Sequence, residues 1–176
     1  MTVAAADEGQ SLVRAAEAQL AEGAFEAAVD TFTACLQEES RAAAAYRGRA
    51  IARFQLKQWG LAVDDFRCSH QLDPADLESW VGWGMSLAMT HAIHEAIDRL
   101  EALAAAHPTY IRGRVQLAQL YYRLCVTAKG RHHMEKALAS RPTAVERRLI
   151  EKTFEEQKKL DEKRYYRPDF EALRRQ

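Results

Sequence analysis

The chain has 176 residues, 25 of them basic and 25 acidic, so its formal net charge is zero. That length suits one domain of ordinary size, and the neutral balance disfavours a dedicated nucleic-acid binder. With only 8 Gly and 4 Pro, and many Leu, Ala and charged residues, the composition predicts an all-α fold.

The first residues predict no targeting element. Residues 1–8 are expected to form a flexible N-terminal tail, because they lack both the basic and the apolar region of a secretory signal. Apolar runs elsewhere are shorter than the ~20 residues that span a membrane. Three cysteines without a Cys-x-x-Cys spacing favour a reducing, cytoplasmic location and small core positions over reactive thiols.

From residue 9 to residue 144 the sequence repeats with a period of 34. We number the positions of each repeat as slots 1 to 34, with Pro74 at slot 32. The four repeats are 9–42, 43–76, 77–110 and 111–144. A period of this length predicts stacked helical hairpins, each made of a first helix A and a second helix B. About three or more such hairpins are needed before their apolar faces are buried.

Residue size at particular slots supports this arrangement. Two antiparallel helices approach closely only where side chains are small, and large residues must fill the space around the crossing. Slots 8 and 20 hold the small residues Ala16, Ala50, Gly84, Ala118, Ala28, Ala62, Ala96 and Gly130. Slots 4 and 24 hold the mainly large residues Leu12, Tyr46, Trp80, Arg114, Phe32, Phe66, Leu100 and Met134.

The turn between the two helices of a hairpin has a clear signal in the first repeat, where Gly23 follows helix A. The fourth repeat has no glycine at the equivalent place, near Cys125. After the repeats, Thr143 and Glu146 form a capping-box pattern that predicts a capping helix over residues 145–164. The aromatic tail, residues 165–176, is expected either to fold back on the array or to bind a partner.

At these positions the chain resembles the tetratricopeptide repeat family. The third repeat carries the pattern most clearly, with Trp80, Trp83-Gly84, Ala96 and Pro108. The resemblance implies a right-handed α-solenoid of four helical hairpins with a C-terminal capping helix. Departures occur at the outer repeats, at Ser40, Arg114 and Gly130.

The resemblance also implies a binding surface, because A helices of this family line a concave peptide-binding groove. Carried over by slot, the candidate residues are Val13, Glu17, Arg47, Ile51, Phe54, Gln55, Val81, Met85, Met89, Arg112, Val115, Gln119, Tyr122 and Arg123. Methionines adapt to irregular apolar ligands, and Gly48, Gly82 and Gly84 are expected to keep the groove shallow. The partner is therefore expected to be a protein or peptide segment with apolar anchors and some acidic character.

One subclass of the family clamps the C-terminal carboxylates of heat-shock chaperones with Lys and Asn at slots 5 and 9. The corresponding residues are Val13 and Glu17 in the first repeat, and Arg47 and Ile51 in the second. The sequence therefore predicts no heat-shock carboxylate clamp.

Catalytic and metal-binding patterns are not found. There is no Gly-rich phosphate loop, HExxH or GxSxG, so no enzyme, cofactor or catalytic residue is predicted. His91 and His94 have a chelating spacing, but no further ligand set completes a site, so they are expected to be exposed turn residues. His132 and His133 are adjacent and point in different directions, which is poor for joint ligation.

The predicted function is a non-enzymatic interaction scaffold or adaptor that binds a peptide or helix in the A-helix groove. Two alternatives remain open: a small chaperone for secreted or assembling subunits, and a nucleic-acid-associated module using the basic fourth repeat. Residues 1–40 contain one basic and eight acidic residues, a net charge of −7, so the remainder carries +7. This asymmetry favours head-to-tail association between copies or two different binding surfaces.

Overall fold

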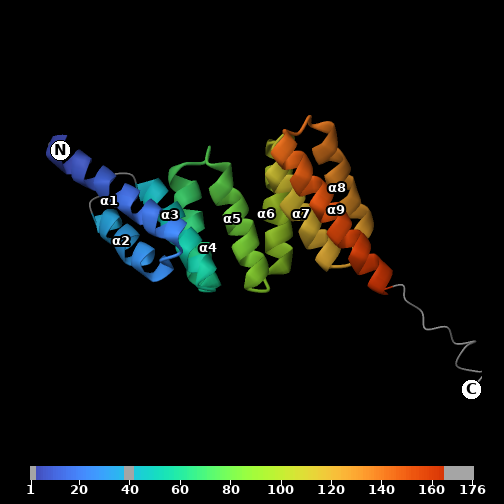
Figure 1. The fold of residues 1–176 in the computed structure, drawn as a ribbon, viewed down its shortest axis with the longest axis horizontal. Helices are drawn as coiled ribbons and strands as arrows, with labels where there is room; N and C mark the ends of the chain where they lie inside the picture. The colour runs from blue at the N-terminus through green and yellow to red at the C-terminus, as the bar shows by residue number, and fades with distance from the viewer. Residues whose placement is uncertain (1–2, 38–41, 165–176) are drawn as a thin grey trace, which may run out of the picture. The chain divides into compact units, whose positions relative to one another are not determined.

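The computed structural model describes residues 3–37 and 42–164, and within these ranges it contains nine α-helices and no strand (Figure 1). The helices are α1 (Val3–Glu22), α2 (Phe25–Gln37), α3 (Ala42–Gln55), α4 (Trp59–Leu72), α5 (Leu77–Met89), α6 (Ile93–Ala106), α7 (Ile111–Arg123), α8 (Thr127–Ala139) and α9 (Ala144–Arg164). They form two compact units, unit 1 (Met1–His107) and unit 2 (Pro108–Gln176).

The predicted hairpins are confirmed. Each repeat supplies one A helix (α1, α3, α5 or α7) and one B helix (α2, α4, α6 or α8), and the two pack against each other. Helix α1 begins at Val3, so it extends into residues 1–8, which were expected to form a tail. The alanines at positions 4–6 explain the extension, since Ala has the highest helix propensity. The aromatic tail at 165–176 lies outside the described residues.

All four A–B turns share one backbone geometry at slot 15. Gly23 has a φ of 80° there, and Lys57, His91 and Cys125 have φ values of 60°, 66° and 62°. In the fourth repeat, the N–H of Cys125 donates to the carbonyl of Tyr122 at 3.0 Å and that of Val126 to Tyr121 at 2.9 Å. This is a Schellman motif, and equivalent bonds end α1 and α3. The turn therefore keeps its geometry in repeats that lack the glycine.

The predicted capping box at the start of α9 is confirmed. The backbone N–H of Thr143 donates to Glu146 Oε2 at 2.8 Å, and the N–H of Glu146 donates to Thr143 Oγ1 at 3.3 Å. The Thr143 hydroxyl also donates to the Glu146 carboxylate, at 2.7 Å. These hydrogen bonds from the side chain and backbone of Thr143 lower the pKa of Glu146 below its ordinary value.

Close packing explains the glycines at slot 6, and it corrects the expectation that they shape a groove. A Cβ on Gly48 would overlap the ring of Phe32 from the preceding repeat, and one on Gly82 would overlap the ring of Phe66. Phe32 is completely buried. These glycines are therefore sockets for the slot-24 phenylalanine of the previous hairpin. Gly84 likewise lies against Leu100 within its own hairpin.

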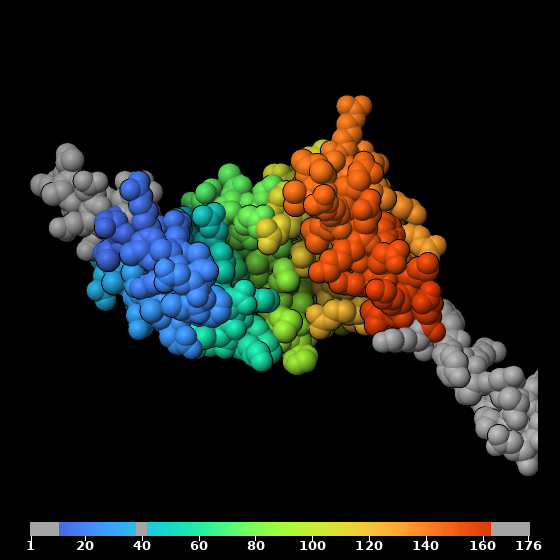
Figure 2. All heavy atoms as spheres, viewed as in Figure 1, coloured from blue at the N-terminus to red at the C-terminus, as the bar shows by residue number. Residues whose placement is uncertain are grey.

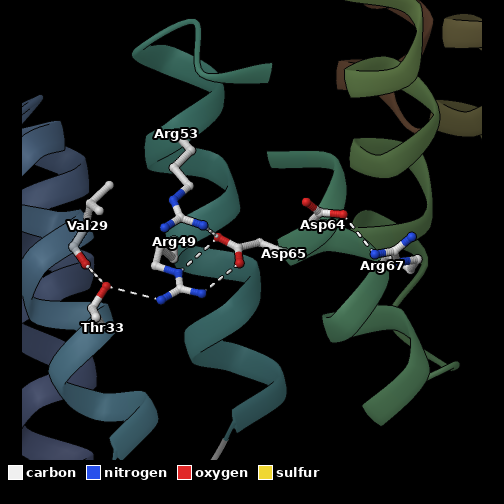
Figure 3. Close-up of polar contacts among 7 residues, drawn as sticks. All are labelled: Val29, Thr33, Arg49, Arg53, Asp64, Asp65 and Arg67. Atoms are coloured by element: carbon white, nitrogen blue, oxygen red, sulfur yellow. Dashed lines mark hydrogen bonds and ion pairs between the residues drawn. The ribbon is translucent and has the colours of Figure 1, made fainter. Parts of the chain in front are cut away.

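A buried ionic network joins the two helices of the second hairpin (Figure 3). It consists of Arg49, Arg53 and Asp65 at slots 7, 11 and 23. Arg49 on α3 donates from Nη2 and Nε to the Asp65 carboxylate on α4, at 2.8 and 2.9 Å, and Arg53 Nη1 donates to it at 2.7 Å. Arg49 also donates to the Thr33 hydroxyl on α2 at 3.1 Å. The Asp65 side chain is only 4% exposed, so its charge is compensated almost entirely by these two arginines.

Other repeats use different chemistry at the same crossing. In the first repeat the Thr31 hydroxyl donates to Gln19 Oε1 at 2.9 Å. In the fourth, the His133 ring stacks on Tyr121 with the ring centroids 5.7 Å apart. The hairpin geometry is thus common to the repeats, while the residues that join its two helices are not.

Candidate protein-binding face

Within unit 1 the helices form two layers. The backbone of the A helix α3 comes close to those of both α1 and α5, whereas the backbones of the B helices α2, α4 and α6 lie farther from one another among the described residues. The A layer is therefore the more tightly spaced.

Six of the predicted groove residues lie on these A helices with their side chains at least partly accessible. We call them the A face: Glu17, Ile51, Phe54, Gln55, Met85 and Met89. They occupy slots 9, 12 and 13 of α1, α3 and α5. Ile51 is the most accessible of the apolar ones, at 38% exposure, while Phe54 and the two methionines are half-buried. The face is thus an apolar strip along contacting helices, with polar residues at Glu17 and Gln55.

Arg47 was also predicted to line the groove, and it has a partner within the chain. Its Nη1 donates to Asp76 Oδ2 at 3.1 Å, and the Arg47 side chain remains 38% exposed. Asp76 is the N-cap of α5 and also accepts from the backbone N–H of Glu78 at 3.2 Å. Arg47 therefore ties α3 to the start of α5, which reduces its capacity to attract an acidic ligand.

Two further predicted residues of unit 1 are not accessible. Val13 is 5% exposed and belongs to the core cluster between the first two hairpins, and Val81 is 2% exposed. The prediction that they line an open groove is wrong. Slot 5 faces the neighbouring A helix, so a short apolar side chain there is buried. Only a long side chain, such as that of Arg47, extends from this slot to the solvent.

In unit 2, helix α9 covers the positions that were expected to be open. Val115 and Tyr122 on α7 are 0% and 6% exposed and share a core cluster with Ile150 of α9. The Gln119 amide donates to the Thr153 hydroxyl of α9 at 3.2 Å. Figure 2 shows the atoms of α9 (orange to red) on the face in view. The prediction for these three residues is corrected, because the capping helix occupies their surface.

The two remaining predicted residues, Arg112 and Arg123, are exposed on α7. Sequence reasoning missed two neighbours of the A face. Leu20 occupies slot 12 of α1, as Phe54 does in α3, and is partly buried against the first core cluster. Glu78 is exposed at slot 2 of α5. Slot equivalence alone would have identified both of them.

His91 is exposed at the α5–α6 turn, as expected, whereas His94 is exposed within the first turn of α6. His132 is exposed, while its neighbour His133 is 6% exposed. Among the cysteines, Cys35 is buried as expected, but Cys125 is exposed because it lies at the tip of an A–B turn. Among the described residues no helix combines the length and the apolar character that crossing a membrane requires.

The sequence matches no protein-family model, and no curated protein matches it. Similar solved structures do exist. TTC0263, a thermophilic TPR protein from Thermus thermophilus, is 19% identical over 88% of this chain and 85% of its own, with a TM-score of 0.71. YrrB, described as a TPR protein with an unusual peptide-binding site, is 18% identical over 84% of this chain and 74% of its own, with a TM-score of 0.68.

A third similar structure is the first TPR of Spaghetti (RPAP3) bound to the HSP90 peptide SRMEEVD. It is 17% identical over 68% of this chain and 95% of its own, with a TM-score of 0.61. All three similarities rest on three-dimensional structure at low identity, and all three proteins are TPR proteins. Together with the 34-residue hairpins described above, they show that this chain has the all-α tetratricopeptide repeat fold.

Proposed function

We propose that the chain is a non-enzymatic scaffold whose A face in unit 1 binds a segment of another protein. The observation that carries this proposal is the strip of accessible apolar side chains formed by Ile51, Phe54, Met85 and Met89. Accessible apolar strips on helices that touch one another are typical of protein-interaction surfaces. Peptide binding by the similar proteins YrrB and RPAP3 is in keeping with it.

The chemistry of the strip indicates the kind of ligand. Two thioethers and an aromatic ring can repack around anchors of different shapes. Glu17 and Gln55 at the edge offer hydrogen-bond acceptors, and Arg47 is already paired with Asp76. The proposed ligand is therefore a helical or extended segment with two or more apolar anchors, and acidic character contributes less to its recognition than the sequence alone indicated.

The test compares two pairs of equal substitutions. Ile51→Lys with Met85→Lys places charge on the A face. The control, Leu61→Lys with Leu72→Lys, does the same on helix α4 of the B layer, where the two leucines are 49% and 56% exposed. Partners captured by the unmodified chain are identified and then titrated calorimetrically against each variant.

The A-face variant should lose binding at least about tenfold while the control keeps it, because a charge desolvated against apolar anchors is costly. Circular dichroism should show equal helicity in all three proteins. Equal affinity of the two variants would reject the assignment of the A face.

The peptide SRMEEVD serves as a specificity control. Neither Val13 and Glu17 nor Arg47 and Ile51 supply the Lys–Asn pair of a carboxylate clamp. No saturable binding of this peptide is expected, and specific binding would show that another residue set captures its carboxylates.

A further inference from the structure

The neutral chain is divided into two oppositely charged halves at the structural boundary. Unit 1, residues 1–107, contains 8 basic and 16 acidic residues, a net charge of −8. Unit 2, residues 108–176, contains 17 basic and 9 acidic residues, a net charge of +8. The formal charge of zero therefore hides a strong separation of charge along the chain.

The terminal repeats contribute half of the negative excess of unit 1 and most of the positive excess of unit 2. The first repeat, 9–42, contains 2 basic and 6 acidic residues, and the fourth, 111–144, contains 7 basic residues and 1 acidic residue. The capping helix adds little, because its 7 basic and 6 acidic residues nearly cancel. At least half of the net charge of each unit thus lies in its terminal repeat.

Key charges of both hairpins are exposed on the B helices. Glu26 and Asp30 are exposed about one turn apart on α2, and Lys129 and Lys136 are exposed about two turns apart on α8, so each pair lies on one face of its helix. None of these four makes an ion pair with another described residue. Glu26 and Asp30 are also like charges at i and i+4, which is mildly destabilising within a helix. This differs from Asp65, whose charge is compensated internally by Arg49 and Arg53.

We propose that the α2 face of one copy, with Glu26 and Asp30, docks on the α8 face of a second copy, with Lys129 and Lys136. Each copy carries both members of the complementary pair at equal and opposite net charge. With zero total charge, two copies also lack the long-range repulsion that keeps strongly charged proteins apart. A phosphate backbone would complement unit 2 only, and unit 1 would repel it.

The first experiment measures the molar mass of the full chain by analytical ultracentrifugation across protein concentration, at low and high salt. The mass should rise with concentration at low salt, to a dimer or to longer chains. The apparent dissociation constant should increase by about tenfold or more at high salt, because exposed ion pairs are screened. A constant monomer mass at low salt would overturn the proposal. So would a salt-dependent change in shape at constant mass, which would place the attraction within one chain.

Charge exchange supplies the specific test. Glu26→Lys with Asp30→Lys makes both docking faces basic, and Lys129→Glu with Lys136→Glu makes both docking faces acidic. Each variant alone should remain monomeric. An equimolar mixture should associate, and a chain carrying all four substitutions should associate as the unmodified chain does. Failure of both rescues, with helicity unchanged, would overturn the proposal.

Two controls keep this result interpretable. Arg148→Glu with Lys159→Glu makes the same change of charge on the exposed surface of α9 and should leave association unchanged. If the acidic variant misfolds, Lys129→Gln with Lys136→Gln should still weaken association by about tenfold. An electrophoretic mobility shift of single-stranded oligonucleotides by the unmodified chain, at salt concentrations where its mass stays monomeric, would overturn the proposal. The basic hairpin would then bind nucleic acid and not a second copy.

The inference is independent of the proposed function. The four exchanged residues lie on B helices, whereas Ile51 and Met85 lie on A helices of unit 1. Loss of association with retained partner capture would concern the charged faces alone. Loss of capture with retained association would concern only the A face.

Discussion

The second and fourth hairpins use the same slots in different ways. In the second, slots 9 and 12 of α3 hold Ile51 and Phe54, which remain accessible. In the fourth, Gln119 and Tyr122 occupy the same slots on α7, and both contact α9. Gln119 donates a hydrogen bond to Thr153, and Tyr122 shares a core cluster with Ile150. The difference shows that a slot specifies where a side chain points, whereas the helices that follow decide whether a ligand can reach it.

The largest expected effect tests the crossing at slot 23. Asp65→Ala leaves Arg49 and Arg53 without their shared carboxylate, so the free energy of unfolding of unit 1 should fall by about 3–5 kcal/mol. The equivalent change in the fourth hairpin, His133→Phe, preserves an aromatic ring on Tyr121 and should change the free energy of unfolding of unit 2, followed by circular dichroism, by less than about 1 kcal/mol. All three tryptophans, at 59, 80 and 83, lie in unit 1, so fluorescence during urea unfolding reports on unit 1 alone.

A matched pair of substitutions measures the cover that α9 provides. Ile150→Ala on α9 removes a completely buried side chain and should destabilise unit 2 by about 2–5 kcal/mol. Ile51→Ala, at 38% exposure on α3, should cost less than about 1 kcal/mol. Circular dichroism during urea unfolding measures both. Similar losses for the two isoleucines would contradict the distinction between a covered and an open A helix.

A smaller effect is expected at the A–B turns. Lys57→Gly and Cys125→Gly should each raise the free energy of unfolding by about 0.5–1 kcal/mol, because glycine adopts positive φ without a Cβ clash. Gly23→Ala should lower it by a similar amount. Thermal melts of the three variants check the sign. A loss of stability in Cys125→Gly would mean that the side chain, not the backbone, matters at that turn.

The smallest expected effect is a pH dependence of unit 1. The His70 ring lies 4.7 Å from the Trp80 ring, and burial, aided by the positive charge of Arg99, lowers the pKa of His70 below 6.5 against the opposing pull of Asp76 and Asp73. Below pH 6.5 the unfolded chain binds this proton more readily than the folded one. Stability should therefore decline as the pH falls below about 6.5 and level off below the folded pKa. Tryptophan-detected urea unfolding should show a weaker decline in His70→Gln.

The hairpins and the capping box were predictable because they depend on local residue size and spacing. Gly130, for example, lies against Tyr122 within one hairpin, as the small-residue rule at slot 20 requires. The burial of Val115 and Tyr122 was not predictable from their slots, because it depends on the α9 residues Ile150 and Thr153 packing back over α7. The burial of these two residues therefore depends on contacts between segments that are far apart in the sequence.

The partners of Asp65 were missed for a related reason. Slots 7, 11 and 23 hold apolar or neutral residues in much of the array, so their charges in the second hairpin looked like ordinary surface residues. Only the folded geometry shows that Arg49, Arg53 and Asp65 converge on one point between α3 and α4 (Figure 3).

The phenylalanine sockets restrict how this array can be lengthened or reordered. Residues 43–76 carry both a socket, Gly48, and a plug, Phe66, so a duplicate inserted directly after them would fit its neighbours on both sides. Residues 111–144 have Gln116 in place of the socket glycine and Met134 in place of the slot-24 phenylalanine, so a duplicate of them would not reproduce this contact. Growth by tandem copying would thus extend the socket contact from the second hairpin but not from the fourth.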